Sequence, residues 1–472
     1  MRIRLPHERL EKRWWRDWWS EDFSWPALAF KKLPAGGPHG EKTLQEYWRR
    51  EPGGARRSDA QLEAAGELVR DPKGRLWHVL HVPLHWSDGT PAKIAWTETE
   101  RERLSALIAA RLMPAVKTSF FFGGTPVSPD GRVQLQGAVL LDPPSAQRAT
   151  PGLALRACCD FAWLPAWDAS EETFAAGAGF RRALFQGPVR FSVARFEAEA
   201  FFERAYFLAD VLFGSKTEPP CSVQFPALVN FQRAIFLGRA GFDGCGFQEA
   251  RFDQAHFASD SNFFAARFKS ASFEGVTFDG PASFLSAQVS DSLSFGAVHA
   301  RSELIFSSAK FSRNARIWFR NSRFDGPVQF MGTELPRRHD NFMSAFAGAS
   351  FSLAPYFEMA GRLWIAALDK ATLERGILLD PAVPAVIERE FLAKVLPDAL
   401  KAPAGGGDYH VVQQLLALAG GCRVLKQSAS KAGDGTVEEL YGRLEKLVNE
   451  QIARFPVPPL DAESSSESDS TA

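Results

Sequence analysis

The sequence is poor in tyrosine and cysteine and has no excess of charge of either sign. Only 5 of its 472 residues are Tyr and 5 are Cys, while 55 basic residues balance 55 acidic ones. The balanced charge argues against a generally basic nucleic-acid binder, and a hydrophobic content of 45% excludes a wholly disordered chain. At roughly 150 residues per domain, the length suggests about three structural units.

The few cysteines lack the spacing of a metal site. No C-x2-C pair is present, so the sequence predicts reduced thiols and gives no reason to expect a metal or another cofactor. A vicinal disulfide between the first two is the alternative interpretation. The five positions are Cys158, Cys159, Cys221, Cys245 and Cys422.

Long apolar runs are absent too. No uninterrupted stretch approaches the roughly 18 residues that a membrane span requires, and residues 1–19 contain no apolar core of a signal peptide. We therefore expect a cytoplasmic, soluble protein without an integral membrane span.

Short catalytic motifs are missing as well. The nearest approach to a metal cluster is His78, His81 and His85. We interpret residues 76–86 as a strand, which would place the first two imidazoles on opposite faces, and Pro83 interrupts the segment before the third. With no Ser-His-Asp motif, H-E-x-x-H motif or phosphate loop either, we predict that the protein is not an enzyme.

Phenylalanine is abundant: 33 of the 40 Phe residues lie between Phe161 and Phe357. In the middle of this stretch they follow one another at steps of five, with a step of six at regular intervals. A small residue stands two positions before nearly every one, such as Ala234 before Phe236. The central residues are Phe231, Phe236, Phe242, Phe247, Phe252, Phe257, Phe263, Phe268, Phe273, Phe278 and Phe284.

This period fits neither a helix nor a strand, because 3.6 would sweep the rings around a helix and 2 would alternate them between two faces. A chain that turns a corner every five residues can use it. Three steps of five and one of six close a four-sided circuit of 21 residues, and alternating steps on both flanks close one of 22. Phe236 should then lie beneath Phe257 and Phe278, and Phe242 beneath Phe263 and Phe284.

Residues 161–357 resemble the pentapeptide-repeat family, whose units place a small residue, a polar residue, a central Leu or Phe and two further polar or small residues in order. The resemblance implies a mainly β fold, a right-handed quadrilateral β-helix in which the central rings stack inside. The pattern weakens near Pro219 and Pro220 and again after Phe330, where we expect the coil to be interrupted.

The flanking segments predict caps for the two ends of the coil. Residues 1–33 hold Trp pairs at helical spacing and predict a helix packed on the body, with a membrane-surface anchor as the alternative. Residues 41–150 predict a small α+β domain. Its elements are a hairpin of strands 76–86 and 92–96, a helix from Thr97 to about Leu112 with Glu100 in a capping box, and strands near 118–122 and 132–141.

After the coil, residues 385–455 predict a helical module and residues 456–472 a disordered acidic tail. Three helices are expected, over 385–400, 411–432 and 437–455. The module resembles one that follows the repeats in some bacterial members of the family. The last helix carries an apolar face that could pack on the coil or pair with a second copy. This face consists of Leu440, Leu444, Leu447, Val448 and Ile452.

Three function classes follow from these expectations. We favour a non-catalytic scaffold that presents a rigid β-helix surface to a protein partner, because a solenoid offers extended surface and no deep pocket. The resemblance also implies mimicry of duplex DNA toward a topoisomerase such as gyrase. Eleven basic against nine acidic residues between Phe231 and Phe330 argue against that role and against nucleic acid as a partner. The third class is an enzyme or effector with its activity in residues 41–150.

Overall fold

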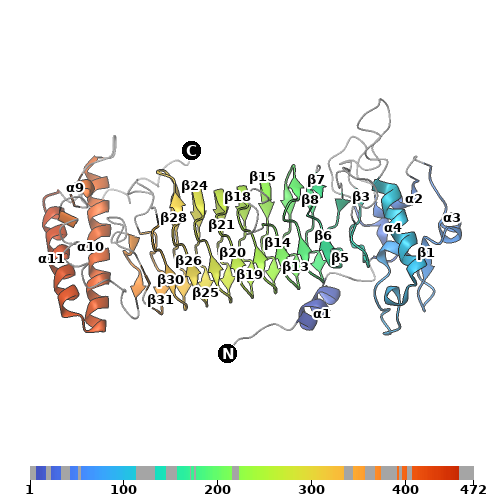
Figure 1. Cartoon of the computed structure of the whole chain (residues 1–472), viewed down its shortest axis with the longest axis horizontal. Helices are drawn as coiled ribbons and strands as arrows, with labels where there is room; N and C mark the ends of the chain where they lie inside the picture. Colours follow the sequence, from blue (N-terminus) through green and yellow to red (C-terminus); the bar gives the residue numbers. More distant parts are fainter. Residues whose placement is uncertain are drawn as a thin grey trace, which may run out of the picture.

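The sides of the coil are short strands such as β16 (Ile235–Phe236), and tight turns form its corners (Figure 1). At one corner the carbonyl of Phe231 accepts a hydrogen bond from the N–H of Ala234 at 2.9 Å, and Arg233 between them has a φ of 59°. The same left-handed conformation recurs two residues after other central Phe residues, as at Gln254 and Ala265. Such residues reverse the chain locally, which is why a five-residue unit can form one side of a closed circuit.

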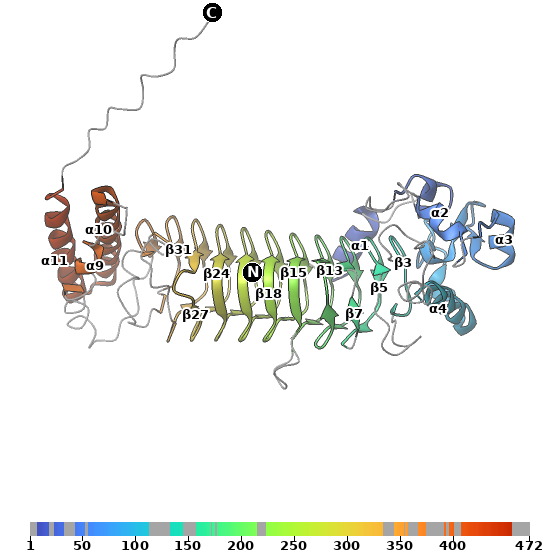
Figure 2. The same cartoon turned by 90° about the horizontal axis from the view of Figure 1, so that it is seen from above.

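The computed structural model describes residues 7–17, 23–32, 43–51, 55–112, 133–144, 157–170, 172–174, 177–214, 223–333, 344–353, 355–356, 367–373, 391–392, 396–400 and 407–455. Across residues 163–373 the chain forms a β-solenoid of about 8 turns whose neighbouring strands are parallel. Helices follow at its C-terminal end, and an α+β region precedes it (Figures 1 and 2).

One side of the solenoid is a sheet of ten strands and another is a sheet of eight. The ten are β5 (Trp163–Leu164), β9 (Leu184–Phe185), β13 (Tyr206–Phe207), β16 (Ile235–Phe236), β19 (His256–Phe257), β22 (Thr277–Phe278), β25 (His299–Ala300), β29 (Arg323–Phe324), β31 (Ser350–Phe351) and β32 (Thr372–Leu373). The eight are β6 (Trp167–Asp168), β10 (Val189–Arg190), β14 (Val211–Leu212), β17 (Ala240–Gly241), β20 (Ser261–Asn262), β23 (Ala282–Ser283), β26 (Leu304–Ile305) and β30 (Val328–Gln329).

The remaining two sides merge, because four longer strands run across the corner between them. These four are β15 (Gln224–Asn230), β18 (Gly246–Arg251), β21 (Arg267–Ser272) and β24 (Gln288–Ser294). They belong to a second ten-stranded sheet, from which β28 branches. Its other members are β3 (Val133–Gln134), β4 (Ala157–Cys158), β8 (Ala178–Gly179), β12 (Ala200–Phe201), β27 (Lys310–Phe311) and β28 (Arg316–Trp318), while β7 (Thr173–Phe174) and β11 (Arg195–Phe196) pair separately.

The interior is filled by columns of stacked rings. Phe257 stacks on Phe236 with ring centroids 4.6 Å apart and on Phe278 at 5.1 Å. Phe263 lies between Phe242 at 4.8 Å and Phe284 at 4.6 Å. The backbone register agrees, because residues 21 apart pair in these turns, and residues 22 apart pair in the flanks. The 21- and 22-residue circuits expected from the sequence are therefore present, and a circuit of 24 residues that was not expected follows them, where His299 pairs with Arg323.

The expected interruptions of the coil lie mostly at 215–222 and 334–343, outside the described residues. On either side the columns continue, since Phe213 stacks on Phe242 at 5.1 Å and Phe319 on Phe346 at 4.7 Å. Strand β3 already joins the sheet that contains β15, and β31 and β32 extend the other ten-stranded sheet toward residue 373. The additional residues between these turns do not interrupt the stacked columns, because each circuit is closed by its own four sides.

One corner of the coil shows a regular alternation of glycine with a slightly larger residue. A Cβ atom on Gly187, Gly238, Gly280 or Gly326 would collide with atoms at the corner of the preceding turn, the main chain included. The residues that it would meet there are Ala166, Ala209, Ser259 and Ser302 in turn. At this corner every second turn therefore requires a glycine, because a side chain there would not fit against the turn before it.

This close approach gives a stability prediction. Replacing Gly280 by Ala is expected to lower the free energy of unfolding by about 1–3 kcal/mol, because the added methyl group would force two turns apart. Ser259→Ala at the facing position is the matched control and should change the value by less than about 0.5 kcal/mol. Denaturant unfolding followed by circular dichroism measures both, and equal midpoints for the two variants would show that the approach is not tight.

The N-terminal helix α1 (His7–Asp17) packs on the outer side of the solenoid. Leu10 and Trp14 are buried against Trp163 and Tyr206, and the Trp14 Nε1 atom donates to the carbonyl of Arg182 at 2.7 Å. The expected packing of this helix on the body is thereby confirmed. The other four Trp residues of the segment differ in position: Trp15 is half-buried and Trp25 buried, while Trp18 and Trp19 lie outside the described residues.

The α+β region differs from the expectation in its strands. Its elements are η2 (Ala27–Ala29), α2 (Leu44–Arg49), α3 (Asp59–Ala64), β1 (Leu68–Arg70), β2 (Leu76–His78), η3 (Val79–His81), η4 (Lys93–Ala95) and α4 (Glu98–Leu112). A hairpin is formed by β1 and β2 around Asp71 and Gly74. The predicted turn at 87–90 is present, with an antiparallel bridge between His85 and Pro91, but the strands predicted at 79–86 and 92–96 are wrong. The predicted capping box of Thr97 and Glu100 is present. Residues 118–122 lie outside the described residues.

At the C-terminal end, α10 (Gly407–Ala432) and α11 (Gly435–Ile452) form an antiparallel pair, with the short α9 (Leu396–Ala399) beside them (Figure 1). Helix α10 contacts β32, and Gly420 lies so close to Asp369 that a Cβ atom there would meet its carboxylate. Residues such as Leu368, Leu415 and Leu418 share one core. The apolar interior of the last turn is thus covered by α10. Much of the helix predicted at 385–400 lies outside the described residues.

Candidate functional site: a basic groove along the solenoid

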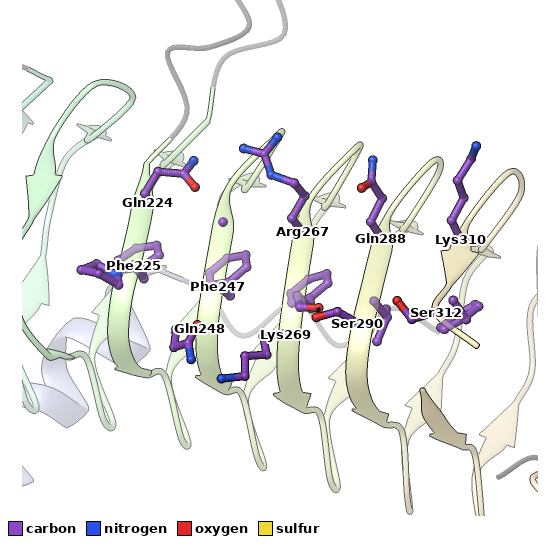
Figure 3. Close-up of a pocket in the computed structure, with 15 residues that line it drawn as sticks. Gln224, Phe225, Phe247, Gln248, Arg267, Lys269, Gln288, Ser290, Lys310 and Ser312 are labelled. Atoms are coloured by element: carbon purple, nitrogen blue, oxygen red, sulfur yellow. Dashed lines mark hydrogen bonds between the residues drawn. The ribbon is translucent and has the colours of Figure 1, made fainter. Parts of the chain in front are cut away.

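A groove of about 700 Å³ crosses five successive turns on one side of the solenoid (Figure 3). Its floor is formed by the first halves of β15, β18, β21 and β24 and by β27. The outward-facing lining residues, most of them polar, form two rows. The inward-facing central residues of the five turns lie between the two rows. One row is Gln224, Gly246, Arg267, Gln288 and Lys310, and the other is Pro226, Gln248, Lys269, Ser290 and Ser312.

The two rows follow from the alternation of side chains along a strand. Phe247 and Phe268 point inward, 3% and 2% exposed, and stack at 4.9 Å, so the residues on either side of each ring must point outward. Parallel register then places equivalent residues of successive turns side by side, as with Arg267 opposite Gly246 and Gln288. A Cβ atom at Gly246 would collide with the side-chain amide of Gln224. The glycine therefore leaves room for that amide to lie across the groove.

The lining of the groove is basic and contains no carboxylate. Its three cations are Arg267, Lys269 and Lys310, and its other polar side chains are amides and hydroxyls. Arg267 and Lys269 are exposed, and neither forms an ion pair with any side chain in the described part of the chain. Two positive charges without a carboxylate partner among the described residues make this side of the solenoid attractive to anions.

Other sides of the solenoid are electrically different. On the sheet that contains β19 and β25, Asp279 accepts hydrogen bonds from His256 and Arg301 at 2.8 and 2.7 Å. Two turns further on, Asp325 is bonded to His299 and Arg323 at 2.8 Å each. Partial burial would raise the pKa of Asp325, but these two hydrogen bonds outweigh it and hold the pKa below its ordinary value. The acidic groups of this side are thus matched by bases.

A second hollow, of about 550 Å³, lies over β10, β14, β17 and β20. It contains Arg190 and Arg239 but also Asp243 and Asp260, so its charges are mixed. Asn262 donates to Asp243 at 2.7 Å within it. The hollow provides a comparison surface that carries arginines without being uniformly basic.

The histidines considered as a metal site from the sequence occupy different places. His78 and His81 are both fully buried, with ring centroids 6.0 Å apart, whereas His85 is exposed. The expectation that the first two lie on opposite faces of a strand is wrong, because β2 ends at His78 and the helical turn η3 carries His81 to the same side. Across the described residues, no group of three or more His, Cys, Asp or Glu side chains is placed to hold a metal ion.

Burial determines the chemistry of this histidine cluster. His81 accepts no hydrogen bond at Nδ1 from the described residues, and its Nε2 lies 2.9 Å from the carbonyl oxygen of Gln136. Burial, with smaller effects from nearby His78 and Lys93, lowers the pKa of His81 to about 3. Burial also lowers the pKa of His78, against the opposing effect of Glu67. Both rings are therefore neutral near pH 7.

Two buried cations lie beside these rings and bind the main chain. The Lys93 Nζ donates to the carbonyls of Leu80 and Val139 at 3.1 and 2.6 Å, and burial lowers its pKa well below the ordinary value. Arg111 donates to the carbonyls of Tyr47 and Trp48 at 3.2 and 3.3 Å. These contacts join segments far apart in the sequence, which is a structural role.

The apolar face of the last helix packs inside the protein. Leu440, Leu444 and Val448 are buried within the core that α10 and α11 share, and Leu447 and Ile452 pack against it. A second copy that paired through this face would first have to displace α10. The four described cysteines are buried, and no disulfide joins them, the adjacent Cys158 and Cys159 included. Burial raises the pKa of the Cys159 thiol, which makes it unreactive as a nucleophile.

The groove was not predicted from the sequence, although a signal for it exists. When the sequence is arranged in circuits, one five-residue unit of each circuit forms the groove side. In five successive turns the residues beside the centre of this unit include no acidic one: Gln-Phe-Pro, Gly-Phe-Gln, Arg-Phe-Lys, Gln-Val-Ser and Lys-Phe-Ser. In the preceding turn the corresponding unit contains Glu197. Reading each side of the coil as a separate column would have identified this surface.

The comparisons with known proteins found no match: no family model, no curated protein and no solved structure is similar enough to the chain to be identified. Within the described residues, no helix has both the length and the apolar character needed to cross a membrane. The class of protein is defined by the fold itself, a β-solenoid with a repeat of about 22 residues.

Proposed function

We propose that the protein is a non-catalytic scaffold whose rigid solenoid presents the basic groove to a protein partner. The observation that carries the proposal is the groove itself, an open surface in which strand register fixes every lining side chain. Its lining offers cations, amides and hydroxyls for binding, but no nucleophile activated by a neighbouring base. The two capped ends leave the sides of the coil as the extended surfaces for recognition.

We also infer that the solenoid is of the pentapeptide-repeat type and bacterial, and that the protein works in the cytoplasm. The five-residue steps, the small residue before each centre and the stacked central rings support the first inference. The lack of a disulfide between adjacent Cys158 and Cys159 agrees with a reducing compartment.

The described residues favour neither alternative function. Mimicry of DNA requires a dense acidic surface, whereas Asp279 and Asp325 are each bonded to two bases. An enzyme in the α+β region requires polar groups that converge on a substrate. There, Lys93, Arg111 and the buried histidines are enclosed, and the two cations are bonded to main-chain carbonyls.

A site-specific photo-crosslinker tests the scaffold proposal. Incorporated in place of Ser290 in the groove, it should capture one protein in the cells that produce the chain, and the same residue in place of Thr277 on β22 should not. The captured protein is identified by mass spectrometry, purified and tested for direct binding to the unmodified chain. Equal capture at both positions, or no direct binding, would contradict a partner at the groove.

A further inference from the structure

The groove presents its positive charges at separated positions along the coil. Arg267 and Lys269 flank the same central residue on β21, and Lys310 lies two turns further on at β27 (Figure 3). Neighbouring strands lie about 4.8 Å apart, so five turns span about 19 Å and the cations of β21 and β27 are about 10 Å apart. An extended peptide rises about 3.3 Å per residue, so about six residues would cover the groove.

Recognition here has to be made by side chains. The main-chain groups of β18, β21 and β24 are already paired with the strands of the turns before and after them. A bound segment can therefore not extend this sheet by main-chain pairing at the groove. The amides of Gln224, Gln248 and Gln288 can both donate to and accept from a peptide main chain. Gln288 lies between the charged turns β21 and β27, and the other two lie on the turns before β21.

From this charge and spacing we propose that the groove binds an extended acidic segment of the partner protein, about six residues long, with carboxylates at alternate positions facing the cations. The inference rests on the proposed function, because it specifies which part of a partner the groove takes. Alternate side chains of an extended chain face the same way, so two or three carboxylates can meet Arg267, Lys269 and Lys310 together. Arginine can pair with a carboxylate through two parallel hydrogen bonds.

A single-stranded nucleic acid fits the groove less well. Such ligands are held by positive charge that tracks each phosphate and by aromatic rings on which the bases stack. The groove has three cations along five turns, and its rings face inward: Phe225 is 2%, Phe247 3% and Phe311 6% exposed. An acidic peptide needs no stacking platform and tolerates spaced charges.

The test measures binding of a fluorescent heptapeptide of alternating Glu and Ser by anisotropy, with its Gln-for-Glu counterpart as control. The full chain should bind the Glu peptide and bind the Gln peptide at least about fivefold more weakly, the loss expected for two exposed ion pairs. The double variant R267A/K269A should weaken the Glu peptide by a similar factor. R190A/R239A removes two arginines from the mixed-charge hollow and should leave its affinity unchanged. Circular dichroism checks that both variants fold.

Several results would overturn the inference. They are equal affinity for the Glu and Gln peptides, an unchanged affinity in R267A/K269A, an equal loss in R190A/R239A, and tighter binding of a ten-nucleotide oligothymidine than of the Glu peptide. The crosslinking experiment separates this failure from failure of the scaffold. A partner captured at Ser290 through a segment without acidic residues keeps the proposed function and removes the acidic-segment inference.

Discussion

Replacing Phe263 by alanine is expected to lower the free energy of unfolding by about 3–5 kcal/mol, because it opens a cavity in a close-packed column of rings. The side chain is fully buried. It stacks between Phe242 and Phe284, and it meets the rings of Phe252 and Phe273 edge to face at 5.6 and 5.5 Å. Truncation therefore removes contacts on four sides at once, which neighbouring turns cannot replace without moving.

The adjacent residue provides a matched control. Phe264 is 39% exposed on the outside of the same turn, so F264A should change the free energy of unfolding by less than about 1 kcal/mol. Guanidinium unfolding of the two variants, followed by circular dichroism and by tryptophan fluorescence, measures the difference. Similar midpoints for F263A and F264A would contradict the stacked interior, because the two substitutions differ only in the direction that the ring faces.

Acidification is expected to destabilise the protein through His81. The pKa of His81 is about 3 in the folded protein and 6.5 as its ordinary value. Between pH 3 and pH 6.5 the imidazole therefore binds a proton in the unfolded chain but not in the folded one. Stability therefore rises with pH across this window and falls as the pH drops through it. At most this single group contributes about 1.4 kcal/mol per pH unit.

Replacing His81 by Gln isolates this effect. The Gln amide can still donate to the carbonyl of Gln136 but cannot titrate, so the slope of unfolding free energy against pH should decrease by up to about 1.4 kcal/mol per unit between pH 6 and pH 4.5. Urea unfolding at several pH values provides the slope. His78 keeps part of the dependence, since burial lowers its pKa in the same direction. An unchanged slope in H81Q would mean that the ring is not buried.

A second group acts in a lower pH range. Burial alone would raise the pKa of Glu67, but the nearby His78, whose Nε2 lies 3.8 Å from the carboxylate, and the bound Arg57 outweigh it and lower the pKa to about 2. The Arg57 Nη2 donates to its carboxylate at 2.7 Å. Because the folded value lies below the unfolded value of 4.5, this contribution is complete above pH 4.5 and is lost toward pH 2. Measurements of the His81 effect above pH 4.5 therefore avoid it.

The solenoid could be predicted from the sequence because its rule is local. Each unit places one large and one small residue inward, and the steps of five and six count out the corners, so Phe242 and Phe263 could be paired without any knowledge of the rest of the chain. The same reasoning works for the capping box of Thr97 and Glu100, whose hydrogen bonds join residues three apart.

The α+β region could not be predicted in this way, because distant contacts determine it. The strand at Leu76 ends at His78, where η3 begins and carries the next imidazole into the core. Lys93 also looks like a surface residue in the sequence, yet its partners Leu80 and Val139 lie 13 and 46 positions away. The groove escaped notice for a related reason, since its residues become neighbours only when whole circuits are placed side by side.

The alternation of glycine with alanine or serine at one corner limits how such a chain can change its length. Gly280 fits against Ser259, and Gly326 against Ser302, so adjacent turns act as matched couples. Deleting one turn would bring two glycines or two larger residues together at that corner and would break the alternation along the remaining coil. Engineered shortening or lengthening should therefore remove or add turns two at a time, which makes the couple of turns the modular unit of this architecture.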